Sequence, residues 1–120
     1  MVGMGLGLGL GLGSNQGGSV ANNPICEAIA AKVCISATFK GHSYLIAPHV
    51  AYKGHKDAPF LDGVVVAKDG HDTNKDRLEN FEITDLTDIS KTSTSFAVKA
   101  RFDPNDPTYL GKTICVVVIV

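Results

Sequence analysis

The chain has 120 residues, of which 44% are hydrophobic and 19% are charged, and its formal net charge is −1. A chain of this length folds as one domain with a core of its own. Its eleven basic and twelve acidic residues provide neither the basic face that nucleic acids require nor a polybasic patch for anionic lipids. We therefore expect no nucleic-acid partner.

The first 23 residues differ from the rest in composition. Residues 5–13 read GLGLGLGLG, and residues 14–23 are rich in Ser, Asn and Gly, as linkers are. This stretch lacks the basic start of a signal peptide and is too short and too weakly apolar to span a bilayer. When extended, it places every Leu on one face, which suits addition to a sheet edge of another chain. We predict an extended arm with its linker (1–23), followed by one β-sandwich domain (24–120).

After this arm, the chain predicts one short helix and then strands separated by turns. Asn23, Pro24 and Glu27 are typical of a helix start. Apolar and polar residues then alternate at period two over residues 33–39. Further strand-like runs span 43–52, 63–67, 77–86, 95–102 and 112–120.

Two of these runs carry additional information. Pro48 marks a sheet edge or a bulge. The uniformly apolar run 112–120 predicts a central strand, or one covered on both faces. Together the strands indicate an antiparallel sandwich or small barrel, and we predict an all-β fold, a small antiparallel β-sandwich of six to seven strands with a Gly/Leu-rich extended N-terminal arm.

Three cysteines, Cys26, Cys34 and Cys115, form an odd set without a C-x-x-C pair. An odd number argues against a complete framework of disulfides within the chain. We expect reduced thiols that pack in the core as small apolar groups. A single bridge that leaves one thiol over is the open alternative.

No motif predicts a metal, a cofactor or catalysis. The histidines are His42, His49, His55 and His71. We expect exposed turn histidines, with a metal site formed by gathered turns as the open alternative. Asp72, Asn74 and Asp76 alternate as in a calcium loop, but Arg77 stands where the sharp turn requires Gly. A nucleophile elbow, an H-E-x-x-H motif and a Cys-His signature are all absent from the sequence. We therefore expect a protein that is not an enzyme.

From Ala37 onward, the order of motifs resembles the H-type lectin domain. The matching segments are TFKGHSYLIAPHVAY, DRL, KTSTSFAVKARF and PTYLGKTICVVVIV. The chain departs from the family in having no Trp, a longer loop between Val50 and Arg77, and no Gly before Phe96. The resemblance implies a small six-stranded sandwich that assembles as a trimer and binds sugars, often N-acetylgalactosamine. Related sandwiches lie at the ends of phage tail fibres.

The resemblance also implies a sugar site. An acid in the loop after the second strand, Asp57 or Asp62, would contribute to it. The other members would be Arg77, Asp103 and Tyr109. Arg and Asp side chains form paired hydrogen bonds to hydroxyl groups, and Tyr offers an apolar plate with a polar tip.

Two functions follow as hypotheses. The first is a structural or assembly protein, a virion, fibre or decoration component that oligomerises through its arm. The alternative is a carbohydrate-binding, lectin-like trimeric adhesion module. Expected partners are copies of the chain in a homotrimer or larger assembly, other structural proteins and glycans. The expected location is a virion or an extracellular assembly, without a recognisable signal peptide.

Overall fold

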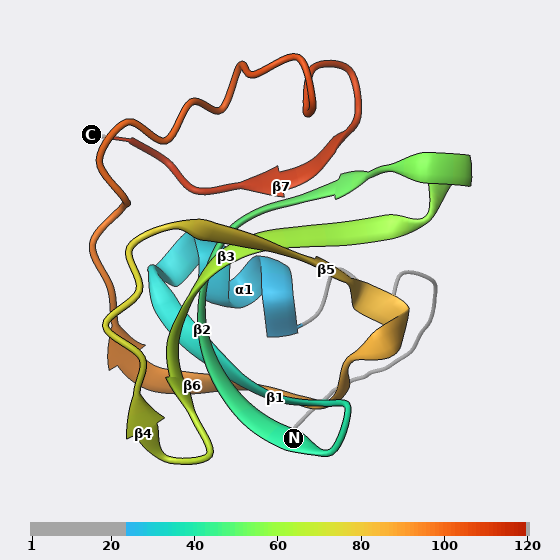
Figure 1. Ribbon diagram of the computed structural model, residues 1–120. Coiled ribbons are helices and arrows are strands. Elements are labelled where there is room, and N and C mark those ends of the chain that lie inside the picture. Colours follow the sequence, from blue (N-terminus) through green and yellow to red (C-terminus); the bar gives the residue numbers. More distant parts are fainter. Residues whose placement is uncertain (1–23, 120) are drawn as a thin grey trace, which may run out of the picture.

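The computed structural model describes residues 24–119 (Figure 1). The predicted arm, residues 1–23, and Val120 lie outside the described residues. The elements are α1 (Pro24–Ala31), β1 (Val33–Phe39), β2 (His42–Lys53), η2 (His55–Asp57), β3 (Pro59–Lys68), β4 (His71–Asp72), β5 (Leu78–Glu82), η3 (Ile83–Asp85), β6 (Thr87–Ser95) and β7 (Thr113–Val116).

All seven strands belong to one antiparallel sheet, which curls into a half-barrel. The strand order is β4-β3-β2-β1-β6, with β5 added beside β3 and β7 beside β2. The long strand β2 pairs with β3 on one side, and on the other side with β1 over its first half and β7 over its second. Figure 1 shows α1 inside the curl. The predicted antiparallel all-β fold is confirmed.

The predicted helix is also confirmed, as α1. Its buried residues Ile25, Ala28 and Ile29 recur at the spacing that places side chains on one helical face. This face joins the core that fills the concave side of the sheet. Glu27 faces solvent instead and lies 3.9 Å from the Lys91 ammonium on β6. The predicted cap, Asn23, lies outside the described residues.

The bulge predicted at Pro48 is confirmed, and it sets the register of β2 and β3 at the centre of the sheet. The pairing of β2 with β3 shifts between Pro48 and Val50, and Pro48 lies opposite Gly63. A Cβ atom at Gly63 would lie 2.7 Å from Ile46 Cγ2 and 2.8 Å from the Ala47 carbonyl oxygen. The two strands therefore approach closely because position 63 has no side chain.

The predicted strand 95–102 is wrong, because β6 ends at Ser95 and the residues after it are irregular. The amide of Lys99 donates to the ring of His49 at 2.9 Å rather than to a neighbouring strand. Phe96 and Phe102 pack on the same imidazole, with ring centroids 5.1 and 5.2 Å away. The alternation of apolar residues in this segment serves packing around one buried side chain.

The prediction of a central strand over residues 112–120 is also wrong, and the strand is shorter than predicted, since β7 spans Thr113–Val116. Within residues 24–119, β7 pairs with β2 alone, so it is an edge strand. Val117 is buried, but Val118 and Ile119 are 62% and 51% exposed. The apolar run therefore turns only part of its surface to the core.

A disulfide joins the first helix to this edge strand. Cys26 and Cys115 form the bond, and their Cα atoms lie 5.8 Å apart. Cys34 keeps a buried free thiol, whose pKa burial raises above its ordinary value. The expectation of three reduced thiols is thus wrong for two of them, because the fold packs α1 against β7. The open alternative, one bridge with one thiol left over, is correct.

Candidate functional site

Asp62 is the centre of a network of polar side chains. Its Oδ2 accepts a hydrogen bond from the Tyr109 hydroxyl at 2.6 Å. Its Oδ1 accepts from the Tyr52 hydroxyl at 3.1 Å and from Asn80 Nδ2 at 2.8 Å. Asn80 Nδ2 also lies 2.7 Å from the Tyr52 hydroxyl oxygen. Side chains from three other segments thus converge on the Asp62 carboxylate.

The sheet register brings these side chains together. Asp62 on β3 pairs with Asn80 on β5, and Tyr52 on β2 pairs with Phe60, two residues before Asp62. Residues two apart on a strand project to the same face, so Tyr52, Asp62 and Asn80 share one face of the sheet. Tyr109 reaches the network from the turn that precedes β7.

The two phenols are held as hydrogen-bond donors. Burial raises the pKa of Tyr52, and the negative charge of Asp62 raises it further. Burial and the hydrogen bond to Asp62 raise the pKa of Tyr109 in the same way. Both hydroxyls are therefore protonated at neutral pH. Asp62 Oδ2 accepts a single hydrogen bond from the described residues, so it has room for another donor.

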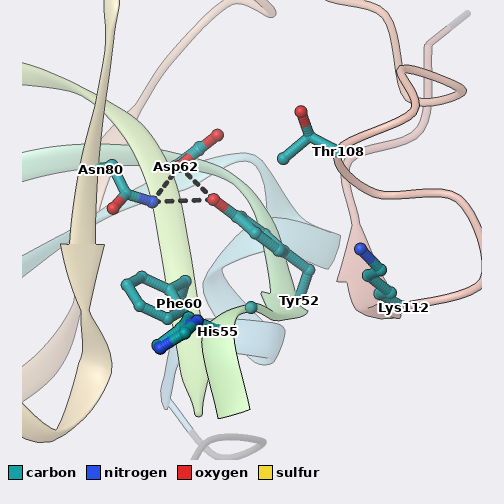
Figure 2. Close-up of a pocket in the computed structure, with 8 residues that line it drawn as sticks. Tyr52, His55, Phe60, Asp62, Asn80, Thr108 and Lys112 are labelled. Carbon is teal, nitrogen blue, oxygen red and sulfur yellow. Dashed lines mark hydrogen bonds between the residues drawn. The ribbon is translucent and has the colours of Figure 1, made fainter. Parts of the chain in front are cut away.

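A hollow of about 460 Å³ opens in front of the network (Figure 2). This size falls within the range of small-molecule sites. Figure 2 shows Asn80 and Asp62 on one side of the Tyr52 ring, and Thr108 and Lys112 on the other. The lining residues are Tyr52, Gly54, His55, Phe60, Asp62, Asn80, Thr108 and Lys112.

Two aromatic rings form the apolar part of this hollow. Tyr52 and Phe60 lie with centroids 6.1 Å apart and planes inclined by only 25°. Gly54 makes room for the second ring, because a Cβ atom there would collide with Phe60. The exposed side chains of His55 and Lys112 add polar groups at the rim. The hollow thus combines an aromatic surface, the fixed carboxylate of Asp62 as an acceptor, and the ammonium of Lys112 as a donor.

The structure separates the five residues that the resemblance placed in a sugar site. Asp62 and Tyr109 are hydrogen-bonded partners. Asp103 lines a smaller neighbouring hollow of about 180 Å³, which Tyr109 also lines. Asp57 in η2 and Arg77 before β5 are exposed and line neither hollow.

Sequence reasoning missed Tyr52, Phe60 and Asn80. A signal for the first two lay in the turn at Lys53-Gly54, since a hairpin there places Tyr52 near Phe60. For Asn80 no such signal existed, because its position depends on the pairing of β5 with β3.

The histidines do not gather. His42, His55 and His71 are exposed, as expected, but His49 is buried. Its Nδ1 donates to the Ala47 carbonyl at 2.9 Å and its Nε2 accepts from the Lys99 amide. Burial lowers the pKa of His49, so the ring is neutral, and both of its nitrogens are occupied. Among residues 24–119, no group of three or more His, Cys, Asp or Glu side chains is placed to hold a metal.

The described part of the chain contains no helix that is long and apolar enough to cross a membrane. No protein-family model, curated protein or solved structure matches this chain. The likeness to H-type lectins therefore rests on the sequence motifs alone.

Proposed function

We propose that the protein binds a small polyhydroxylated ligand, a sugar, in the hollow around Asp62. The observation that carries this proposal is the Asp62 carboxylate, which two tyrosines and Asn80 hold in place beside an aromatic surface. A prearranged acceptor lowers the ordering cost of binding. The ligand then meets an acceptor whose direction is already fixed.

The distribution of polar groups favours a sugar over a charged ligand. Asp62 repels an anion, and its oxygens already accept three hydrogen bonds, which weakens them as ligands for a cation. Sugar hydroxyls both donate and accept. They match the free capacity of Asp62 Oδ2 on one side and the Lys112 ammonium on the other. The half-buried ring of Phe60, which stacks on the buried Tyr52, offers contact to the C–H face of a sugar.

A glycan array followed by calorimetry tests this proposal. We expect Phe60→Ala to weaken binding of the best glycan about tenfold, since loss of an aromatic contact is worth about 1.4 kcal/mol. Lys112→Ala tests the polar rim. Thermal unfolding of each variant separates lost binding from lost folding.

Arg77→Ala is the matched control. Arg77 is exposed and lines neither hollow, so its removal leaves binding unchanged if the site is the hollow around Asp62. A loss of binding in Arg77→Ala with retention in Phe60→Ala would place the site elsewhere. Absence of signal from every glycan would end the proposal.

Self-assembly is a second candidate, and the edge strand β7 favours it. We propose that copies of the chain associate, in a homotrimer or a larger structure of a virion or fibre. Within residues 24–119, β7 has a strand neighbour on one side only, and Val118 and Ile119 next to it are exposed. Exposed apolar edges pair readily with other chains. The Cys26–Cys115 bond supports an extracellular location, because disulfides persist in oxidising surroundings.

The mass of the full chain in solution tests self-assembly. Light scattering coupled to size-exclusion chromatography gives an oligomer for the intact chain, and deletion of residues 1–19 reduces it to the monomer. An intact chain that stays monomeric at high concentration contradicts the proposal.

A further inference from the structure

The structure places the residue that follows the arm, Pro24, close to the edge strand of the sheet. Pro24, the first described residue, lies two positions before Cys26, which is bonded to Cys115 on β7. The Cα atoms of the two cysteines are 5.8 Å apart. The arm therefore joins the domain next to β7, where a covalent bond fixes its point of attachment.

Within residues 24–119, no strand pairs with the outer side of β7. The Val117 amide donates to the His49 carbonyl on β2 at 2.8 Å. Backbone groups of successive residues in an extended chain point to opposite sides, so those of Val116 point away from β2. No described strand lies on that side. The backbone groups of Val116 thus have no partner strand among the described residues.

Exposed apolar side chains flank β7 along the chain. Leu110 (58% exposed) precedes β7, and Val118 and Ile119 (62% and 51%) follow it; these are the most exposed large hydrophobic residues of the described chain. Residues 113–119 contain no charged side chain. Proteins usually protect an edge strand with charges or Pro. Residues 113–119 carry no such residue, and the nearest charges come from other segments, since Lys99 and Arg101 line a hollow with Ile119.

We propose that residues 5–13 of a second copy add to β7 as a new edge strand. This inference rests on the proposed self-assembly and names the surface that receives the arm. In an extended Gly-Leu repeat, every Leu points to one face, where it packs against the apolar residues that flank β7. The arm is long enough, since 23 extended residues reach roughly 75 Å and the longest dimension of the molecule is 40 Å.

The length of the repeat favours a second copy over the arm of the same chain. The four Leu side chains of residues 5–13 are spread over roughly 20 Å of extended chain, whereas a four-residue strand such as β7 covers roughly 10 Å. One edge therefore cannot bury the whole Leu face. Two arms exchanged around a symmetry axis cover the remaining leucines of each other.

The test compares full-length variants by sedimentation equilibrium. Val118→Lys places a charge beside the β7 edge, and Thr94→Lys places the same charge on an exposed position of β6 as a control. We expect Val118→Lys to raise the dissociation constant of the oligomer at least tenfold, as does Leu8→Ser combined with Leu10→Ser. Thr94→Lys leaves it unchanged. In the wild type, the Val116 amide exchanges slowly with deuterium at high protein concentration and faster on dilution.

Other results would overturn the inference in distinguishable ways. If the double Leu variant dissociates while Val118→Lys does not, copies assemble through the arm on another surface, and only the assignment of β7 fails. If the intact chain is a monomer with a protected Val116 amide, the arm covers its own edge. If it is a monomer with an unprotected amide, the proposed self-assembly fails as well.

Discussion

The bond between Cys26 and Cys115 provides a direct test of how the fold is stabilised. Replacing both cysteines with serine opens a covalent loop that spans a sequence separation of 89. In the chain-entropy description, a cross-link over a loop of about 90 residues stabilises the folded state by about 4.6 kcal/mol at 25 °C. Because small domains are stable by about 5–15 kcal/mol, this loss is about 30% or more of the free energy of unfolding.

The effect acts on the unfolded chain more than on the folded one. Ile25, Ala28 and Ile29 keep α1 in the core without the bond. The serine variant should therefore fold to the same structure. Its unfolded chain is less compact, so the urea dependence of the unfolding free energy becomes steeper.

Urea denaturation followed by circular dichroism measures both quantities. We expect the Cys26→Ser, Cys115→Ser variant and the reduced wild type to show the same lowered midpoint. Cys34→Ala is the control, because it removes one buried sulfur and leaves the bond in place. If the free energy of unfolding of the double variant falls by less than about 1 kcal/mol, the bond is not the main constraint on the unfolded chain.

Three further predictions concern single residues. Burial lowers the pKa of His49 in the folded state, so the unfolded state binds more protons below about pH 6.5. The unfolding free energy should therefore decrease by up to about 1.4 kcal/mol for each unit by which the pH drops below this value. Thermal unfolding between pH 8 and 5 should show this decrease, and its absence contradicts the neutral ring. Tyr109→Phe removes a donor to the Asp62 carboxylate and should destabilise by about 2 kcal/mol in urea denaturation, whereas an unchanged midpoint argues that the bond adds nothing. Gly63→Ala sets a methyl group against the β2 backbone and should destabilise by about 1–3 kcal/mol, and wild-type stability in this variant would mean that the strands separate freely.

Sequence patterns predicted elements well where side chains alternate between core and solvent. The run 33–39 matches β1, because its apolar positions lie on the face that packs against the core. β6 was not predicted, since Ile89 and Thr92 alone among its side chains are partly buried. Pairing with β1, including the hydrogen bond from the Thr92 hydroxyl to the Cys34 carbonyl, holds this polar strand in place.

The candidate site was predicted only in part, for a related reason. Asp62 and Tyr109 were named, but their contact joins residues 47 positions apart through a turn that no local pattern specifies. Asn80 enters through the pairing of β5 with β3. The spacing of residues along the chain does not indicate which residues of β5 and β3 lie opposite each other. Arg77 lies outside both hollows, and the sequence could not indicate this, because a charged residue before a strand looks the same whether it faces a site or solvent.

The two partners of β2 on one side also impose an order on biosynthesis. Ile46 pairs with Ile35 in a local hairpin, whereas Val50 pairs with Val116, which lies 66 positions further along the chain. A ribosome translating the chain therefore releases the first hairpin long before the strand that completes the same edge, and contacts of such separation form slowly. During that interval Cys26 has emerged without Cys115. The Cys26–Cys115 bond can form only after Cys115 has been translated. If an oxidant acts earlier, the thiol nearest to Cys26 in the sequence is that of Cys34.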